Sequence, residues 1–187
     1  RNFVYALAGW SQPSAGFLLR ADGASEPLPQ FTTALATRLP EVEVHDVQVR
    51  SHDGVAVPVT LLHRKGLARD GRNPALVQGY GSYGLSMTAG FRPSDMVWIE
   101  QGGVLAVANV RGSGVHGDPW RQAGTRLAKP NTWKDGIAVA QYLIDQGYAS
   151  PATMAIAGGS AGGIFAGRAI TEAPQVFAAA VIHVGLL

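Results

Sequence analysis

The sequence predicts an α/β fold in which a mainly parallel sheet carries helices on both of its faces. Short apolar runs at residues 74–78, 104–110 and 154–157 are typical of buried strands, and helical segments separate them. Residues 132–147 form the clearest amphipathic helix, which Gly147 ends. A glycine-rich turn then joins the last of these strands to a second helix at residues 164–172.

The chain begins with a segment that we expect to lie outside this sheet. Residues 3–7 and 16–20 are strand-like runs with a loop between them, and residues 21–29 are rich in turn formers. This pattern predicts a β-hairpin that is too small to hold a core alone. Residues 31–40 have the character of a linker.

A second hairpin opens the main domain. Strands at residues 42–49 and 55–62 flank a turn at residues 51–54, which predicts an antiparallel pair. Pro58 has no N–H group, so it predicts an edge position for its strand. The last strand is expected within residues 176–184.

Composition narrows the possible functions. A chain of 187 residues, 47% hydrophobic and 15% charged, suits one sizeable domain, alone or with an appendage. The 15 basic and 13 acidic residues are scattered, so we expect no nucleic-acid partner. No apolar run reaches the ~18 residues of a membrane span, so we expect no membrane partner. The absence of cysteine excludes disulfides and leaves the compartment, cytoplasmic or periplasmic, open.

The most informative motif is the glycine-rich turn at residues 158–163, which contains Gly-x-Ser-x-Gly between a strand and a helix. This is the pattern of the nucleophile elbow of α/β-hydrolases, in which small neighbours allow a sharp turn. It predicts Ser160 as an exposed nucleophile and the N–H group of Ala161, at a helix N-terminus, as an oxyanion donor. The alternative is a plain glycine-rich turn.

Other glycine motifs compete with this interpretation. Residues 79–84 and 112–117 fit the Gly-x-Gly-x-x-Gly spacing of a dinucleotide loop, but Pro93 and Pro119 interrupt the helix that such a loop requires. Residues 158–163 also match the glycine spacing of a P-loop, without its lysine. We find no His, Asp or Glu cluster with metal-ligand spacing. The sequence therefore predicts neither a cofactor nor a metal.

A tyrosine offers a second oxyanion donor. Tyr80 follows the strand whose loop supplies such a donor in α/β-hydrolases, and its hydroxyl can act as an N–H group would. The alternative is a surface aromatic loop. Arg111 follows another buried strand, and a structural ion pair with Asp135 or Asp118 is favoured over contact with a substrate.

The histidines give no clear catalytic base. His183 is expected near a strand end, in the core or at the edge of the sheet, and His116 lies in a loop near the expected mouth of the site. The remaining histidines, His45, His52 and His63, are interpreted as structural or solvated.

Several motifs together resemble the prolyl oligopeptidase family of serine peptidases. They occur in the order seen in that family, and the similarity covers most of residues 41–187. The matching segments are residues 78–84, 108–114, 133–135, 142–144 and 158–163, with residues 51–54 and 57–59 similar to the start of its catalytic domain.

The resemblance implies an α/β-hydrolase catalytic domain capped in cis by a β-propeller. Residues 1–35 would then be a remnant of the last propeller blade, residues 36–40 a linker, and residues 41–187 the N-terminal part of the catalytic domain. The implied activity is that of a serine peptidase acting on short peptides. An esterase or acyl-aminoacyl hydrolase on the same fold, and a non-catalytic binding protein, remain as alternatives.

The resemblance also assigns roles to residues. Ser160 is the implied nucleophile, Tyr80 and Ala161 form the oxyanion hole, and Tyr83 lines the pocket for the residue before the cleaved bond. Ser82 stands where the family more often has glycine, and Ala161 where an asparagine is common, which leaves the side-chain preference open.

The family's catalytic Asp and His lie well after the nucleophile. In this chain Glu172 and His183 are the acid and base that follow Ser160, and neither is assigned to a triad. We therefore expect this chain to be a fragment with little or no hydrolase activity alone.

Overall fold

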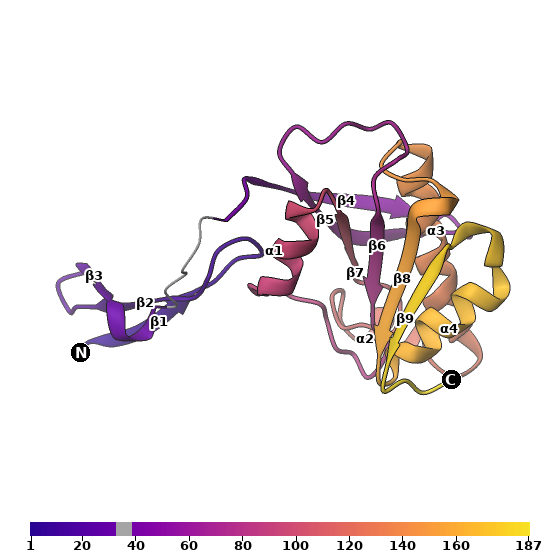
Figure 1. The fold of residues 1–187 in the computed structure, drawn as a ribbon. Helices are drawn as coiled ribbons and strands as arrows, with labels where there is room; N and C mark the ends of the chain where they lie inside the picture. The colour runs from indigo at the N-terminus through magenta and orange to yellow at the C-terminus, as the bar shows by residue number, and fades with distance from the viewer. Residues whose placement is uncertain (33–38) are drawn as a thin grey trace.

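The computed structural model describes residues 1–32 and 39–187 and contains two sheets. The smaller, antiparallel sheet has the strand order β1-β2-β3 and lies to one side of the larger one (Figure 1). Its strands are β1 (Phe3–Leu7), β2 (Ala15–Leu19) and β3 (Ser25–Leu28). The predicted hairpin was therefore incomplete. Only residues 20–24 form the turn, closed by a hydrogen bond from the Arg20 N–H to the Ala24 carbonyl, and the chain then returns along β2. Residues 33–38, which include the end of the predicted blade remnant and the start of the predicted linker, lie outside the described residues.

The larger sheet confirms the predicted mainly parallel topology. Its order is β4-β5-β7-β6-β8-β9, in which β6, β7, β8 and β9 are parallel and β5 is antiparallel to both of its neighbours, β4 and β7. Its strands are β4 (Val42–Arg50), β5 (Ala56–Arg64), β6 (Ala75–Gly79), β7 (Val104–Ala108), β8 (Met154–Gly159) and β9 (Ala179–His183).

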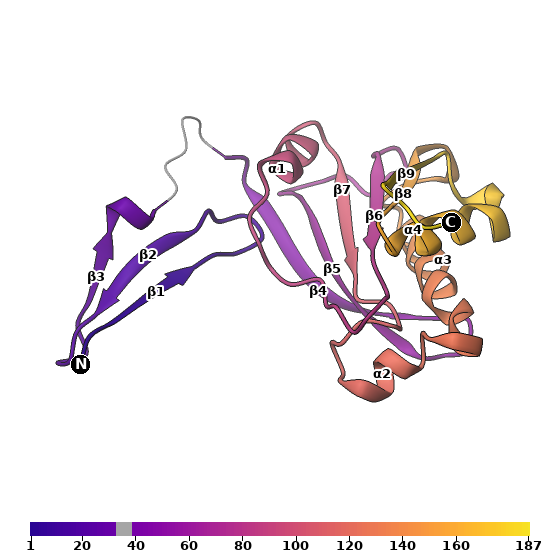
Figure 2. The ribbon, with the colours of Figure 1, turned by 90° about the horizontal axis from the view of Figure 1, so that it is seen from below.

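Helices cover both faces of this sheet, as predicted (Figures 1 and 2). Helix α1 packs on β5 and β7, whereas α3 and α4 pack on the opposite face. The α-helices are α1 (Pro93–Glu100), α2 (Asp118–Gln122), α3 (Pro130–Asp145) and α4 (Gly162–Glu172). Short 3₁₀ turns span Pro29–Phe31, Arg126–Ala128, Pro151–Thr153 and Pro174–Val176. Among the described residues, no helix has both the length and the apolar character that a membrane crossing needs.

Helices α1 and α2 were not predicted, because the prolines at their starts were interpreted as helix breakers. Pro93 and Pro119 instead occupy the first turns of these helices. In the first turn of a helix the N–H groups have no intrahelical acceptor, so proline loses no hydrogen bond there. Its fixed φ also suits a helix. The prolines therefore begin helices rather than interrupt them.

The prediction that Pro58 marks an edge strand was wrong, because β5 pairs with β4 on one side and with β7 on the other. The Pro58 carbonyl accepts a hydrogen bond from Asn109, just beyond the end of β7. In an antiparallel strand the N–H and C=O groups of one residue point to the same neighbouring strand. The N–H group that Pro58 lacks would therefore also face Asn109, the residue after β7. The Asn109 carbonyl, which a donor at position 58 would face, accepts the indole N–H of Trp120 at 3.1 Å instead.

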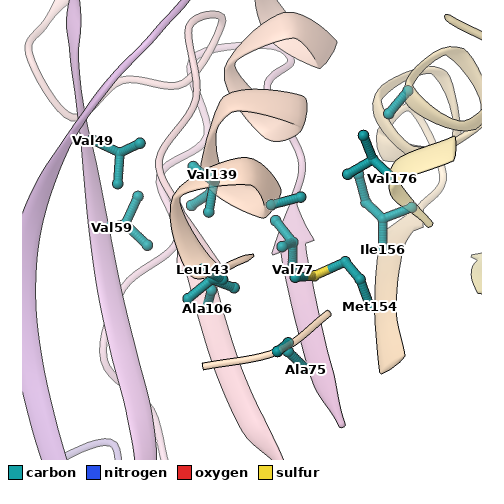
Figure 3. Packing of buried hydrophobic residues seen from close by; sticks show 14 of the residues in the cluster. Val49, Val59, Ala75, Val77, Ala106, Val139, Leu143, Met154, Ile156 and Val176 are labelled. Carbon is teal, nitrogen blue, oxygen red and sulfur yellow. The ribbon is translucent and has the colours of Figure 1, made fainter. Parts of the chain in front are cut away.

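The main core lies between the sheet and helices α3 and α4 (Figure 3). Val139, Ala140 and Leu143 of α3 are fully buried against it, while Ile137, Tyr142 and Ile144 of the same helix are partly buried at its margin. The Phe165 ring of α4 is fully buried, and it fills the space above Gly79 of β6. This packing fixes α4, and therefore the turn before it, against the carboxyl end of the sheet.

A second cluster lies on the α1 face. Its buried members come from β5, β7 and α1, and Trp10 from the loop of the small sheet packs against them. The small sheet is therefore in contact with the α1 side of the domain. The buried members are Leu62, Met96, Ile99, Leu105 and Val107.

Candidate active site

Ser160 stands at the turn between β8 and α4, and its side chain is exposed as the sequence predicts. Its φ of 52° lies in the left-handed region, which is strained for a residue with a side chain. Backbone bonds of 2.9 Å hold this conformation from both sides: the Ser160 N–H donates to His183, and its carbonyl accepts from Gly163 and Leu186. The turn therefore presents the hydroxyl to solvent from a fixed backbone.

The glycine two residues before Ser160 is required by close packing. A Cβ atom on Gly158 would lie 2.0 Å from the Gly162 carbonyl oxygen, so the end of β8 and the start of α4 meet backbone to backbone. The elbow motif is thus a steric condition for the turn.

The two predicted oxyanion donors belong to neighbouring segments: Ala161 directly follows Ser160, and Tyr80 begins the loop after β6. Ala161 is the N-cap of α4, where N–H groups have no intrahelical partner and negative charge is favoured. Tyr80 directly follows β6, the parallel neighbour of β8, and is half-buried. A Cβ atom on Gly162 would lie 3.2 Å from Cδ2 of Tyr80, so the tyrosine ring rests on the first residue of α4.

Tyr83, the predicted substrate-binding residue, lies farther out on the same loop. Its φ is 56° and its side chain is 72% exposed, which leaves the ring free to contact a ligand. The loop itself rests on residues 112–114. A Cβ atom on Gly112 (φ 99°) would lie 2.0 Å from the Gly81 carbonyl oxygen, and the Gly84 N–H donates to the Gly112 carbonyl at 3.1 Å. The dinucleotide-like glycine spacing is therefore explained by contact between two loops.

A residue that the sequence analysis missed holds the tyrosine loop in place. Lys129 Nζ donates to the Gly81 carbonyl at 2.6 Å and to Ser82 Oγ at 2.9 Å, and burial lowers the pKa of the Lys129 ammonium. Ser82, the departure from the family pattern, is buried and accepts this bond. A single lysine before a proline carries no local signal for this contact.

Arg111 forms the structural ion pair that the sequence favours, with Asp135 as its partner. The Arg111 side chain is 4% exposed and that of Asp135 fully buried, and their closest N···O distance is 2.7 Å. Asp135 also accepts the backbone N–H of Arg111 at 2.9 Å and the Ser51 hydroxyl at 2.6 Å. Asp118 bonds to Arg121 instead. The network ties the start of the 111–114 loop to helix α3 and to the β4–β5 turn.

Asp53 in the β4–β5 turn completes this network and predicts an acid-sensitive contribution to stability. The hydrogen bond from Arg111 lowers the pKa of the Asp53 carboxyl below its ordinary value. A carboxyl with a depressed folded-state pKa stabilises the protein above its unfolded-state pKa of about 3.9, and this stabilisation is lost as the pH falls through the folded-state pKa.

We therefore expect Asp53→Asn to flatten the decline of melting temperature below about pH 4, relative to the unmodified protein. Thermal melts across that range measure the effect, and Asp22→Asn, an exposed aspartate of the small sheet's turn, is the control. If the melting temperatures of Asp53→Asn and of the unmodified protein fell in parallel as the pH was lowered, this account of the network would be wrong.

The acid and base that follow Ser160 lie in different environments. Glu172, at the end of α4, accepts the indole N–H of Trp133, so its carboxylate is engaged at the far end of the helix. His183 is exposed at the end of β9 and, with Tyr80 and Gly158, lines a hollow of about 400 Å³. His116 packs edge-on against Trp120, with ring centroids 5.0 Å apart. The prediction that none of these residues belongs to a triad stays a prediction.

The chain is similar in sequence to known proteins. Residues 89–187 match the model of the prolyl oligopeptidase family. A prolyl endopeptidase of Elizabethkingia meningoseptica is 39% identical over 137 residues, which are 73% of this chain and 19% of that protein. A dual-function macrocyclase-peptidase of Galerina marginata is 32% identical over 192 residues, covering 99% of this chain and 26% of that protein.

The fold is similar to solved structures as well. One, from a structural and mechanistic study of two prolyl endopeptidases, superposes with a TM-score of 0.93 at 37% identity. The match covers 100% of this chain and 27% of the solved one. The chain therefore spans about a fifth to a quarter of the length of these relatives.

Proposed function

The chain belongs to the prolyl oligopeptidase family, and from this membership we propose that the intact protein is a serine peptidase that hydrolyses short peptides. The observation that carries the proposal is the elbow itself: an exposed Ser160 at φ 52°, with Tyr80 resting on the first residue of the following helix. The named relatives, a prolyl endopeptidase and a macrocyclase-peptidase, act on peptides and support it.

The reaction proposed is a two-step acyl transfer. Ser160 Oγ attacks the peptide carbonyl carbon while a histidine takes its proton, and the tetrahedral oxyanion accepts hydrogen bonds from the Tyr80 hydroxyl and the Ala161 N–H. Collapse expels the amine, which receives the proton, and water then releases the acyl group from Ser160. In this fold the acid and the histidine follow the nucleophile along the chain. Because the matched segment is 19% of the bacterial relative, we propose that the intact protein supplies both from outside residues 1–187.

The same proposal extends to the domains. Residues 1–35 would belong to the last blade of a β-propeller, and residues 41–187 to the first part of the catalytic domain. The separate antiparallel sheet β1-β2-β3 supports this division, as does the Galerina relative, whose match includes the N-terminal segment.

A fluorophosphonate probe tests the proposal in the intact protein. Covalent labelling of Ser160 is expected for a serine hydrolase and would not occur in a binding protein that has lost its triad. Turnover of a prolyl-amide peptide compared with that of a short acyl ester then separates a peptidase from an esterase. Absence of labelling at Ser160 in active, folded protein would overturn the assignment.

Replacing Tyr80 by phenylalanine tests the oxyanion hole. The ring remains packed on Gly162 while the donor is lost, so we expect kcat for a prolyl-amide peptide to fall by about 10²–10³-fold with KM little changed. Tyr142→Phe removes a tyrosine hydroxyl from helix α3 that has no part in the proposed chemistry and is the matched control, with kcat expected to stay near that of the unmodified protein. An unchanged kcat in Tyr80→Phe would remove Tyr80 from the reaction.

A further inference from the structure

Three ligand-type side chains meet on the β4–β5 hairpin. Glu43 and His45 lie two residues apart on β4, so their side chains share one face of the sheet, and Glu43 pairs directly with His63 of β5. One ligand atom from each side chain lies within 4.8 Å of the other two. We call these residues the Glu43–His45–His63 cluster.

The cluster lies at the end of the sheet opposite to that of Ser160. Leu62, next to His63, pairs with Leu105 near the start of β7, whereas the elbow follows the end of the parallel strand β8. The reaction proposed above therefore leaves these side chains unused.

His63 carries an unmet lone pair. Its Nδ1 lies 3.0 Å from the Arg64 carbonyl oxygen, and because a carbonyl can only accept, Nδ1 carries the proton and Nε2 is left as an acceptor. The residue is 3% exposed, and Nε2 is buried with no hydrogen-bond partner among the described residues. Its ring packs against Tyr148, with centroids 5.6 Å apart. A backbone carbonyl that fixes one ring nitrogen so that the other presents its lone pair is typical of a metal-ligating histidine.

Glu43 and His45 supply the other two ligands. Glu43 Oε2 lies 3.2 Å from His45 Nε2, so these two side chains already meet. The His45 side chain is 44% exposed, so the cluster opens to solvent on that side. The neighbouring cation Lys65 is paired with Glu41 and does not occupy this position.

We propose that Glu43, His45 and His63 bind a divalent ion of the Zn²⁺ type. Two imidazole nitrogens and one carboxylate oxygen form a ligand set suited to Zn²⁺, and water from the open side would take the fourth position. The ion satisfies the buried Nε2 of His63 and links strand β4 to β5. The site is independent of the proposed peptidase activity.

Titration of the metal-free intact protein with Co²⁺, a spectroscopic substitute for Zn²⁺, tests the site. We expect visible absorption bands of a four-coordinate ion that Zn²⁺ displaces. Glu43→Gln and His45→Gln each remove a ligand at a solvent-accessible position and should weaken the affinity by at least about 10–100-fold, the loss usual even for outer-shell partners. His63→Gln should abolish binding, and the other two variants keep the test valid if this one fails to fold.

Thermal melts give a second readout. Zn²⁺ should raise the melting temperature of the unmodified protein and of His116→Gln, an exposed histidine outside the cluster, but not of Glu43→Gln or His45→Gln. The proposal is overturned if Co²⁺ gives no such bands, or if the cluster variants bind it as tightly as the unmodified protein does.

Discussion

Ser160→Ala in the intact protein is expected to lower kcat for a prolyl-amide peptide by on the order of 10⁶-fold, because the attacking oxygen is removed and nothing in the elbow replaces it. The backbone of the turn is held by bonds from the main chain of residues 160, 163 and 186, so the fold should remain intact. Steady-state kinetics and fluorophosphonate labelling measure the loss, and circular dichroism checks the fold.

Ser86→Ala is the matched control for this experiment. Ser86 lies on the loop that follows Tyr83, and its hydroxyl has no part in the proposed chemistry. We expect its turnover and labelling to match those of the unmodified protein. Labelled, active Ser160→Ala protein would show that another residue is the nucleophile.

The second large effect is expected in stability. Asp135→Ala removes the buried partner of Arg111 and leaves its guanidinium in the interior, where Asp53, partly exposed, is the remaining ion-pair partner among the described residues. Breaking a buried pair from one side typically lowers the free energy of unfolding by about 3–5 kcal/mol. The backbone N–H of Arg111 and the Ser51 hydroxyl lose their acceptor in the same variant.

Urea denaturation followed by circular dichroism measures this change. Asp118→Ala is the control, because it removes a carboxylate from an exposed pair with Arg121 and should change stability little. If the two variants lost equal stability, the buried network would not have the role assigned to it.

The strands of the main sheet were predictable because buried parallel strands are short, continuous apolar runs. Residues 104–108 are fully buried and the sequence marks them clearly. Strand β3 was missed because Ser25, Glu26 and Pro27 have no apolar pattern, and its place is set by pairing with β2. Helix α1 was missed because the sequence cannot show whether Pro93 starts a helix or breaks one.

The candidate site divides in the same way. Ser160 and Ala161 belong to a local motif in which consecutive small residues allow the sharp turn, so the sequence alone identifies them. Lys129 acts on Gly81 across 48 positions, and Glu43 meets His63 through strand register. Such contacts depend on the packed fold, and residue spacing does not encode them.

The contact between Gly81 and Gly112 has a consequence for mutational tolerance. Because a Cβ atom at position 112 would overlap the Gly81 carbonyl oxygen, any replacement there must displace the loop that carries Tyr80. Position 112 should thus be as intolerant of substitution as a residue that touches substrate, although it does no chemistry. A systematic mutational scan for loss of activity would therefore identify position 112 as well as Ser160, in this case for purely steric reasons.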